Sequence, residues 1–150
     1  MDLTIREFES EDIDLYLEGE VDAFQLTYPG LSVTEEMKKE FKDHVERSIS
    51  SGTSTGFTAV ANNPIGFIIL GTQYIYTVPA GYVENIYIKE EERNKGYGRK
   101  LLKFAEEYCK NNGLNILQLD VSIHHQAALK LYKSEGYSVA NYRMEKNIAL

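Results

Sequence analysis

A short turn that contains two glycines carries the clearest chemistry in this sequence. It reads Arg93-Asn94-Lys95-Gly96-Tyr97-Gly98, and two more basic residues follow at Arg99 and Lys100. A strand-like run ends at Ile88 just before it, and an amphipathic helix is predicted just after it. Glycines here let backbone N–H groups approach an anion, and the N-terminus of the helix adds partial positive charge. The combination indicates a pyrophosphate-binding turn.

Two common phosphate-binding motifs do not match this turn. A dinucleotide fingerprint needs a third glycine three residues after the second, where this chain has Leu101. A P-loop needs Gly-Lys-Ser/Thr, and that triplet does not follow Gly98. Gly-x-Gly alone is more often an ordinary strand-to-helix connection, so the surrounding sequence has to decide.

A second group of residues lies after the next predicted strand. Its members are His125, Ala128, Leu131, Tyr132, Gly136 and Tyr137. With Arg93, Gly96 and Gly98, this group resembles the two linked motifs of the GNAT superfamily of N-acetyltransferases. Those motifs are Arg/Gln-x-x-Gly-x-Gly/Ala and, later, Asn-x-x-Ala-x-x-Leu-Tyr before Gly-Phe/Tyr. His125 replaces the usual Asn, and its imidazole can still form a hydrogen bond.

The resemblance implies acetyl-coenzyme A as co-substrate. Residues 93–99, His125 and Ala128 are then expected to hold it, with the backbone of Ile86 and Ile88 pairing with the pantetheine arm. A backbone N–H near Tyr87 or Ile88 would polarise the thioester carbonyl. The acceptor amine would attack directly, without an acetyl-enzyme intermediate. The lone cysteine, Cys109, falls within a predicted helix and is expected to pack in the core.

Three residues are candidates for proton transfer. The resemblance makes Tyr132 the general acid for the leaving thiolate. The alternative is an ordinary aromatic residue whose ring packs in the core, and the spacing of the motif favours the acid. Regular strand alternation places Glu84 on one face with Ile86 and Ile88, as a general base or as a group that only binds the acceptor. Asp120 occupies a carboxylate position that some protein N-terminal acetyltransferases of the superfamily use as base. Its alternative is a structural hydrogen bond in the sheet.

The elements that must position these residues form one domain, 1–150. We expect an α/β (mixed α+β) fold of the GNAT type, with a mixed central sheet of six to seven strands flanked by four helices. Strands are expected at 3–8, 57–61, 65–72, 82–88 and 116–121, with two more between 137 and 148. Helices are expected from about residue 9, and at 34–48, 98–111 and 125–134.

Charge is distributed unevenly along the chain. The net charge is −7, and residues 1–50 carry 14 acidic and 5 basic side chains. This acidic segment either forms solvated helices or attracts a cationic acceptor, while the basic remainder holds an anion. The overall charge argues against binding to nucleic acid. The histidines lack partners at metal-binding spacing, so no metal site is predicted.

The remaining expectations concern location and function. The longest apolar or glycine run, 65–71, is too short for a membrane span and no secretory signal is visible, so we expect a cytoplasmic protein without a membrane partner. The predicted function is N-acetylation of a primary amine on a cationic small molecule or peptide. The alternative is a non-catalytic acyl-coenzyme A sensor. Acceptor choice should depend on residues 13–48 and a loop at 74–76, and assembly as a homodimer is left open.

Overall fold

The computed structural model describes residues 2–149, and its centre is a five-stranded mixed sheet. The first four strands form an antiparallel series and lie side by side in chain order: β1 (Thr4–Glu7), β2 (Ser54–Ala61), β3 (Asn63–Ile75) and β4 (Val78–Ile88). The short strand β5 (Leu117–Leu119) is parallel to β4 and forms the edge of the sheet.

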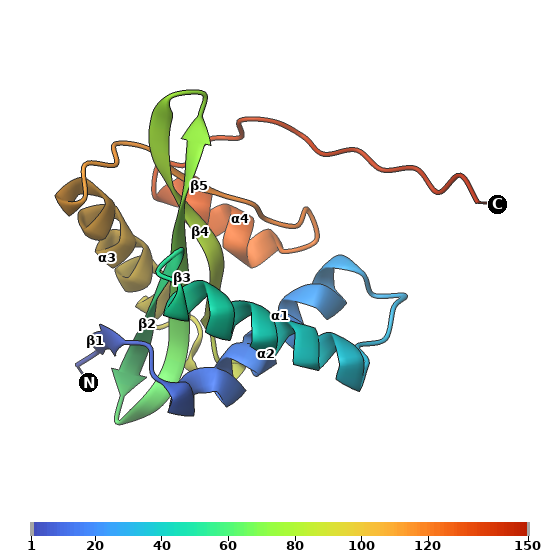
Figure 1. Ribbon diagram of the computed structural model, residues 1–150, viewed down its shortest axis with the longest axis horizontal. Helices are drawn as coiled ribbons and strands as arrows, with labels where there is room; N and C mark the ends of the chain where they lie inside the picture. The colour runs from blue at the N-terminus through green and yellow to red at the C-terminus, as the bar shows by residue number, and fades with distance from the viewer. Residues whose placement is uncertain (1, 150) are drawn as a thin grey trace.

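Helices cover both faces of the sheet (Figure 1). The pair α1 (Ile13–Thr27) and α2 (Glu35–Ser50) lies on one face, and α3 (Tyr97–Asn111) lies on the other. The short helix α4 (Gln126–Ser134) packs against α3. Single 3₁₀ turns, Ser10–Asp12 and Glu90–Glu92, precede α1 and α3. Within residues 2–149 there are four α-helices, as predicted.

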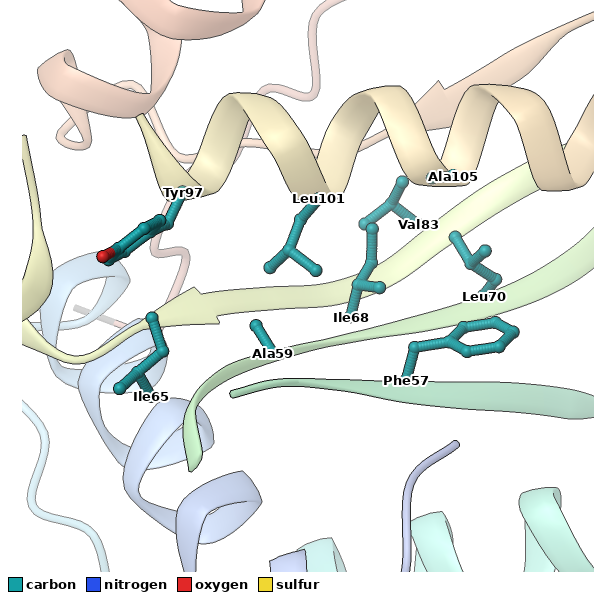
Figure 2. Packing of buried hydrophobic residues seen from close by; sticks show 9 residues of the cluster. All are labelled: Phe57, Ala59, Ile65, Ile68, Leu70, Val83, Tyr97, Leu101 and Ala105. Carbon is teal, nitrogen blue, oxygen red and sulfur yellow. The ribbon is translucent and has the colours of Figure 1, made fainter. Parts of the chain in front are cut away.

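The two faces of the sheet have separate apolar cores. Leu101 and Ala105 of α3 lie one helical turn apart and face Ile68, Leu70 and Val83 of the strands (Figure 2). On the opposite face, buried strand residues pack against the paired N-terminal helices; this second core contains Leu15, Tyr16, Val45, Phe67, Ile69 and Tyr87. A sheet that is buried on both faces holds its central strands rigidly, and β4 is one of them.

Three predicted helix ends are confirmed. The Thr34 hydroxyl accepts a hydrogen bond from the Met37 N–H at 3.1 Å, which caps α2. Gly113 ends α3 with φ of 73°, and Leu114 N–H then reaches the Cys109 carbonyl at 2.8 Å. Gly136 follows α4 with φ of 93°. Cys109 is buried in α3, so the prediction that it packs in the core is also confirmed.

The predicted strands between 137 and 148 are wrong, and the sheet has five strands rather than six to seven. Residues 138–149 contain no strand and run as one extended segment that leaves the body (Figure 1). Strand-like composition becomes a strand only where another strand pairs with it, and residues 138–149 pair with no other described strand.

The predicted loop at 74–76 is also largely wrong. Tyr74 and Ile75 belong to β3, which forms with β4 a long hairpin that turns at Tyr76, where φ is 57°. The hairpin projects beyond the rest of the sheet (Figure 1). In the part of the chain that the structure describes, no helix is long and apolar enough to cross a membrane.

Candidate active site

An extra residue in β4 sets the geometry of the site. The register of β3 and β4 shifts between Ile69 and Leu70: Ile69 lies opposite Asn85, and Leu70 lies opposite Val83. Glu84 is therefore the additional residue of a β-bulge. Bulges bend a strand and redirect its side chains, and this one lies in the middle of the strand that leads to the glycine turn.

The bulge overturns the prediction that Glu84 shares a face with Ile86 and Ile88. Val83, Ile86 and Ile88 pack on the α3 side of the sheet, whereas Glu84 and Asn85 face the α1 and α2 side. Regular alternation would have placed Val83 and Ile86 on opposite faces. The extra residue shifts the alternation by one position, so Glu84 turns to the α1 and α2 side, opposite to Ile86 and Ile88.

The carboxylate of Glu84 lines a pocket of about 200 Å³ between the sheet and the N-terminal helices. The other lining residues are Tyr16, Glu20, Phe41, His44, Ile69 and Asn85. The Ser54 hydroxyl donates a hydrogen bond to Glu84 Oε1 at 2.7 Å. Gly71 lies under the same carboxylate, where any Cβ would overlap with Glu84 Oε1. The glycine thus leaves room for the acid.

Glu20 is the second acid of this pocket. The Asn85 side chain donates a hydrogen bond to Glu20 Oε1 at 2.6 Å. Burial raises the pKa of Glu20, while hydrogen bonds from Tyr16 and Asn85 and the charge of His44 act in the opposite direction. Burial also raises the pKa of Tyr16 well above its usual value, so this hydroxyl stays protonated. The pocket presents two carboxylates to any group that enters it.

The pairing of β4 with β5 ends at Val83, directly before the bulge residue Glu84, and an opening between the two strands begins there. The two strands pair only from Gly81 to Val83, so within the described residues no strand pairs with that side of β4 from Glu84 onward. Lys89 N–H donates to the Ile65 carbonyl of β3 at 2.8 Å. Because backbone groups alternate sides along a strand, Tyr87 faces β3 and Ile86 and Ile88 face the opening.

The sequence suggested backbone groups of Ile86, Tyr87 and Ile88 as contacts for acetyl-coenzyme A, and their orientation in β4 distinguishes between them. Ile86 and Ile88 direct their N–H and C=O groups toward the open edge, which is what strand-like pairing with an extended ligand requires. The Ile88 carbonyl already accepts a hydrogen bond from Arg93 Nε at 2.9 Å. The Tyr87 N–H faces β3, which leaves Ile88 as the better placed of the two predicted thioester-polarising donors.

The glycine turn opens α3 as predicted. Gly96 is its N-cap residue with φ of 83°, and a Cβ there would meet no atom within 4 Å. Asn94 also has a positive φ, 64°. The first N–H groups of α3, beginning at Tyr97, have no carbonyl partner within the helix, so they are available to an anion. A Cβ at Gly98 would press on Leu131 of α4, so this glycine lets the two helices approach closely.

The basic residues of the turn have different partners. The Arg93 guanidinium lies 3.4 Å from Asp22 of α1 and stacks over the Tyr87 ring at 5.5 Å. Its side chain therefore ties α1 to β4. Arg99 Nε lies 3.0 Å from Glu135, and Lys95 Nζ lies 2.8 Å from Glu92. The roles of Arg93, Lys95 and Arg99 in cofactor binding stay predictions.

Buried residues of α4 pack against Ile86 of β4 and Leu119 of β5. Tyr132 and Ala128 are buried against Leu102 of α3, with Val121 and Leu131 beside them. Burial raises the pKa of Tyr132 to about 12, so its hydroxyl keeps its proton at neutral pH. His125 is the N-cap residue of α4. Burial, followed by the charge of Arg93, lowers its pKa, so the imidazole is neutral near pH 7.

Asp120 follows β5 at the edge of the opening. It accepts a hydrogen bond from the Tyr82 hydroxyl at 2.5 Å, which bridges β4 and the end of β5. Burial and this hydrogen bond raise the pKa of Tyr82 to about 12. Asp120 thus has the structural partner that was its alternative interpretation, and its carboxylate is exposed to solvent.

The profile of the Acetyltransferase (GNAT) family matches residues 18–137. The chain belongs to this family. The predicted superfamily is therefore confirmed, and its enzyme class is that of the N-acetyltransferases.

Named relatives of this GNAT chain are distant. An uncharacterised N-acetyltransferase of Methanocaldococcus jannaschii is 25% identical over 139 residues, which cover 89% of this chain and 60% of that protein. The glucosamine 6-phosphate N-acetyltransferase of Arabidopsis thaliana is 26% identical over 81% of this chain and 82% of its own. The chain spans 60% or less of the length of the first three curated relatives.

A solved structure shares the GNAT fold. It is a predicted acetyltransferase of Clostridium acetobutylicum with acetyl-coenzyme A, 18% identical, with a TM-score of 0.76 over 98% of this chain and 97% of that one. The similarity in fold confirms the predicted α/β architecture.

Several residues of this GNAT site were not singled out from the sequence. Glu20, Asn85, Ser54 and Tyr82 reach the pocket or the opening through contacts that span 30 to 65 residues. The acidic charge of residues 1–50 was the one available signal for Glu20, because it indicated a cationic acceptor without naming a residue.

Proposed function

We propose that this GNAT chain transfers an acetyl group from acetyl-coenzyme A directly to a primary amine on a cationic small molecule or peptide. The observation that carries the proposal is the position of β4 between two opposite charge environments. The C-terminal end of β4 leads to the basic turn and the N-terminus of α3. The bulge in the middle of β4 places Glu84 in the acidic pocket.

The residues of the turn suit the pyrophosphate of acetyl-coenzyme A. Gly96 leaves open space above a left-handed backbone, and the free N–H groups at the start of α3 point along the helix axis. Lys100 adds positive charge, and Ile86 and Ile88 offer backbone groups at an open strand edge. The Clostridium neighbour, which shares this fold, was solved with acetyl-coenzyme A.

The chemistry divides between named groups. Acetyl-coenzyme A supplies a thioester, whose carbonyl carbon forms the new C–N bond and whose C–S bond breaks. The Ile88 N–H would stabilise the negative charge that develops on the carbonyl oxygen. Because the pKa of Tyr132 is about 12, its hydroxyl is protonated at neutral pH and would give that proton to the leaving sulfur.

The acceptor amine must lose a proton before it attacks. Glu84, held by Ser54, is our first candidate for the group that takes this proton, directly or through water. Glu20 would hold the cationic part of the acceptor, because a second carboxylate in the same pocket favours positive charge. Asp120 is the second base candidate, since it lies beside the opening with its carboxylate exposed.

The pocket favours cationic acceptors over phosphorylated ones. The relative from Arabidopsis is named for glucosamine 6-phosphate. Two carboxylates in a pocket of about 200 Å³ would repel that phosphate. A second, shallower hollow of about 540 Å³ shares Phe41 and His44 with the pocket and adds Glu40, Asp43 and Arg47. Because the carboxylates of the pocket and the hollow outnumber this one arginine, an acceptor with two separated amines, such as a polyamine or an aminoglycoside, would fit there.

The test is a screen of amines with release of thiol as the readout, after calorimetry with acetyl-coenzyme A. We expect binding of acetyl-coenzyme A, and thiol release that is faster with polyamines, aminoglycosides or peptide N-termini than with glucosamine 6-phosphate. Binding without thiol release from any amine would favour the non-catalytic sensor. Absence of binding would remove both functions.

A further inference from the structure

The bulge in β4 places a second side chain, Asn85, in the acidic pocket. Neighbouring residues of a regular strand point to opposite faces of the sheet, yet Glu84 and Asn85 both line this pocket. The Asn85 amide donates a hydrogen bond to Glu20 Oε1 of α1 at 2.6 Å, across 65 positions of sequence. The bulge therefore supplies the pocket with one acid and with the amide that holds the other.

A buried glycine of α1, Gly19, brings this helix close to the sheet. A Cβ at Gly19 would lie 2.8 Å from the Phe67 ring and 2.9 Å from Tyr87 Cβ, so only glycine fits between the helix and the strands. The next residue along the helix is Glu20, which reaches Asn85 from this close approach. The contact between Glu20 and Asn85 is thus fixed by the packing of α1 on β4.

Two well-buried acids elsewhere in the chain are paired with cationic side chains. The side chain of Asp12 is 1% exposed and lies 2.7 Å from Arg6. The side chain of Glu135 is 9% exposed and lies 3.0 Å from Arg99 and 3.4 Å from Lys103. These cations balance the charge of the carboxylates within the protein, as a purely structural acid requires.

Glu20 has partners of a different kind. Tyr16 and Asn85 give it neutral hydrogen-bond donors, and none of the described residues that line the pocket is a lysine or an arginine. Neutral donors favour the charged carboxylate without cancelling its charge, which stays available to a ligand. The other groups that face Glu20 are His44 of α2, whose charge favours the carboxylate, and Glu84 of β4, whose charge opposes it.

We propose that Asn85 is a positioning residue that sets acceptor specificity: acting through Glu20, it holds this carboxylate for a second cationic group of the acceptor. The inference rests on the proposed acetylation of a cationic amine. Glu84 takes the proton from the amine that reacts, and Glu20 binds the ammonium group that does not react. Acceptors with two amines are therefore preferred to monoamines of the same length.

The first test measures binding, so it does not depend on turnover. Calorimetry in excess coenzyme A compares 1,4-diaminobutane with butylamine, which lacks only the second amine. We expect the wild type to bind the diamine at least about tenfold more tightly. Asn85→Leu, which keeps the size of the side chain and removes its donors, should lose most of this preference with an unchanged far-UV spectrum. A wild type without the preference, or a preference that survives in Asn85→Leu, would overturn the proposal.

The second test asks whether Asn85 acts through Glu20. Glu20→Gln should lose the diamine preference, and the double variant Glu20→Gln/Asn85→Leu should bind the diamine as Glu20→Gln does, because no charge is left for Asn85 to hold. Losses that multiply in the double variant would reject positioning through Glu20. Asn115→Leu, at an exposed position outside the pocket, is the matched control and should keep the wild-type preference.

The third test is the pH dependence of the diamine preference. Because the hydrogen bond from Asn85 lowers the pKa of Glu20, its loss raises this pKa. As pH falls, the preference that remains in Asn85→Leu should therefore disappear at a higher pH than in the wild type. His44 is present in both proteins, so the difference between them reports on Glu20. Equal pH profiles would contradict the role of Asn85.

The binding tests also separate this inference from the proposed acetyl transfer. A diamine preference that disappears in Asn85→Leu supports the inference even if no amine releases thiol, an outcome that would reject only the acetyl transfer. Thiol release at equal efficiency from the diamine and the monoamine would support the transfer and reject the inference.

Discussion

Ser54 of β2 holds the carboxylate of Glu84 of β4 through a hydrogen bond of 2.7 Å, although β3 lies between the two strands and the residues are 30 positions apart in sequence. The same carboxylate lies over Gly71, which has no side chain to displace it. An acid that is positioned this way can face an acceptor in the pocket with a defined orientation, which is the requirement for proton transfer.

The first prediction concerns this acid. Glu84→Gln should lower the rate of acetyl transfer by about 100-fold because the amide cannot accept the proton, while acetyl-coenzyme A affinity should stay the same. Gly71→Ala is the matched positional variant: it keeps the acid but pushes it aside, and should also lower the rate. Steady-state kinetics across pH checks both. If Glu84→Gln keeps the wild-type pH profile, Asp120→Asn becomes the variant to measure.

The second prediction concerns Tyr132. Tyr132→Phe should lower the rate by about 100-fold with little change in acetyl-coenzyme A affinity, since the lost group acts on the leaving sulfur. Because burial raises the pKa of Tyr132 to about 12, its deprotonation should not limit the rate between pH 7 and about pH 10. Tyr137→Phe, which changes the neighbouring ring in the same way, is the control. Equal rates for wild type and Tyr132→Phe would assign the tyrosine to packing.

The third prediction concerns the turn. Gly96→Val forces a β-branched side chain into a backbone with φ of 83° and fills the space above the first N–H groups of α3. Acetyl-coenzyme A affinity should fall by at least about tenfold, measured by calorimetry. Gly113→Val places the same strain at the other end of α3, where φ is 73°, and should leave the affinity unchanged. Equal losses in both variants would point to general destabilisation.

The fourth prediction concerns acid stability. Asp12 is buried, and its carboxylate accepts hydrogen bonds from Arg6 at 2.7 Å and Thr58 at 2.8 Å. Burial alone would raise its pKa, but the hydrogen bonds and the charge of Arg6 lower it below the usual 3.8. The stabilisation is therefore complete above the unfolded pKa and is lost as pH falls through the lower folded value.

Asp12→Asn should accordingly lower the free energy of unfolding by about 2 kcal/mol at pH 7 and less at pH 2 to 3. Urea unfolding at the two pH values measures the difference. Glu35→Gln, which removes an exposed carboxylate 3.3 Å from Lys38, should change stability by less than about 0.5 kcal/mol at either pH. A pH-independent loss for Asp12→Asn would contradict the role given to its charge.

Much of the fold and the cofactor side of the site could be predicted because their signals are local. The spacing of apolar residues specified α3, the left-handed glycines marked helix ends, and Gly96 with Gly98 marked the turn. Two motifs at family spacing then identified the superfamily. Such patterns depend on residues a few positions apart, and backbone preferences act at that range.

The sequence by itself determined the family, the turn and the acidity of the N-terminal segment, whereas only the tertiary structure decided which side chains meet. The bulge at Glu84 arises from the register between β3 and β4, and it reversed the predicted face of that residue. Arg93 pairs with Asp22 across 71 positions, and Asn85 with Glu20 across 65. The C-terminal segment has strand-like composition but no strand partner among residues 2–149. Pairing and register depend on distant backbone, so local sequence patterns do not specify them.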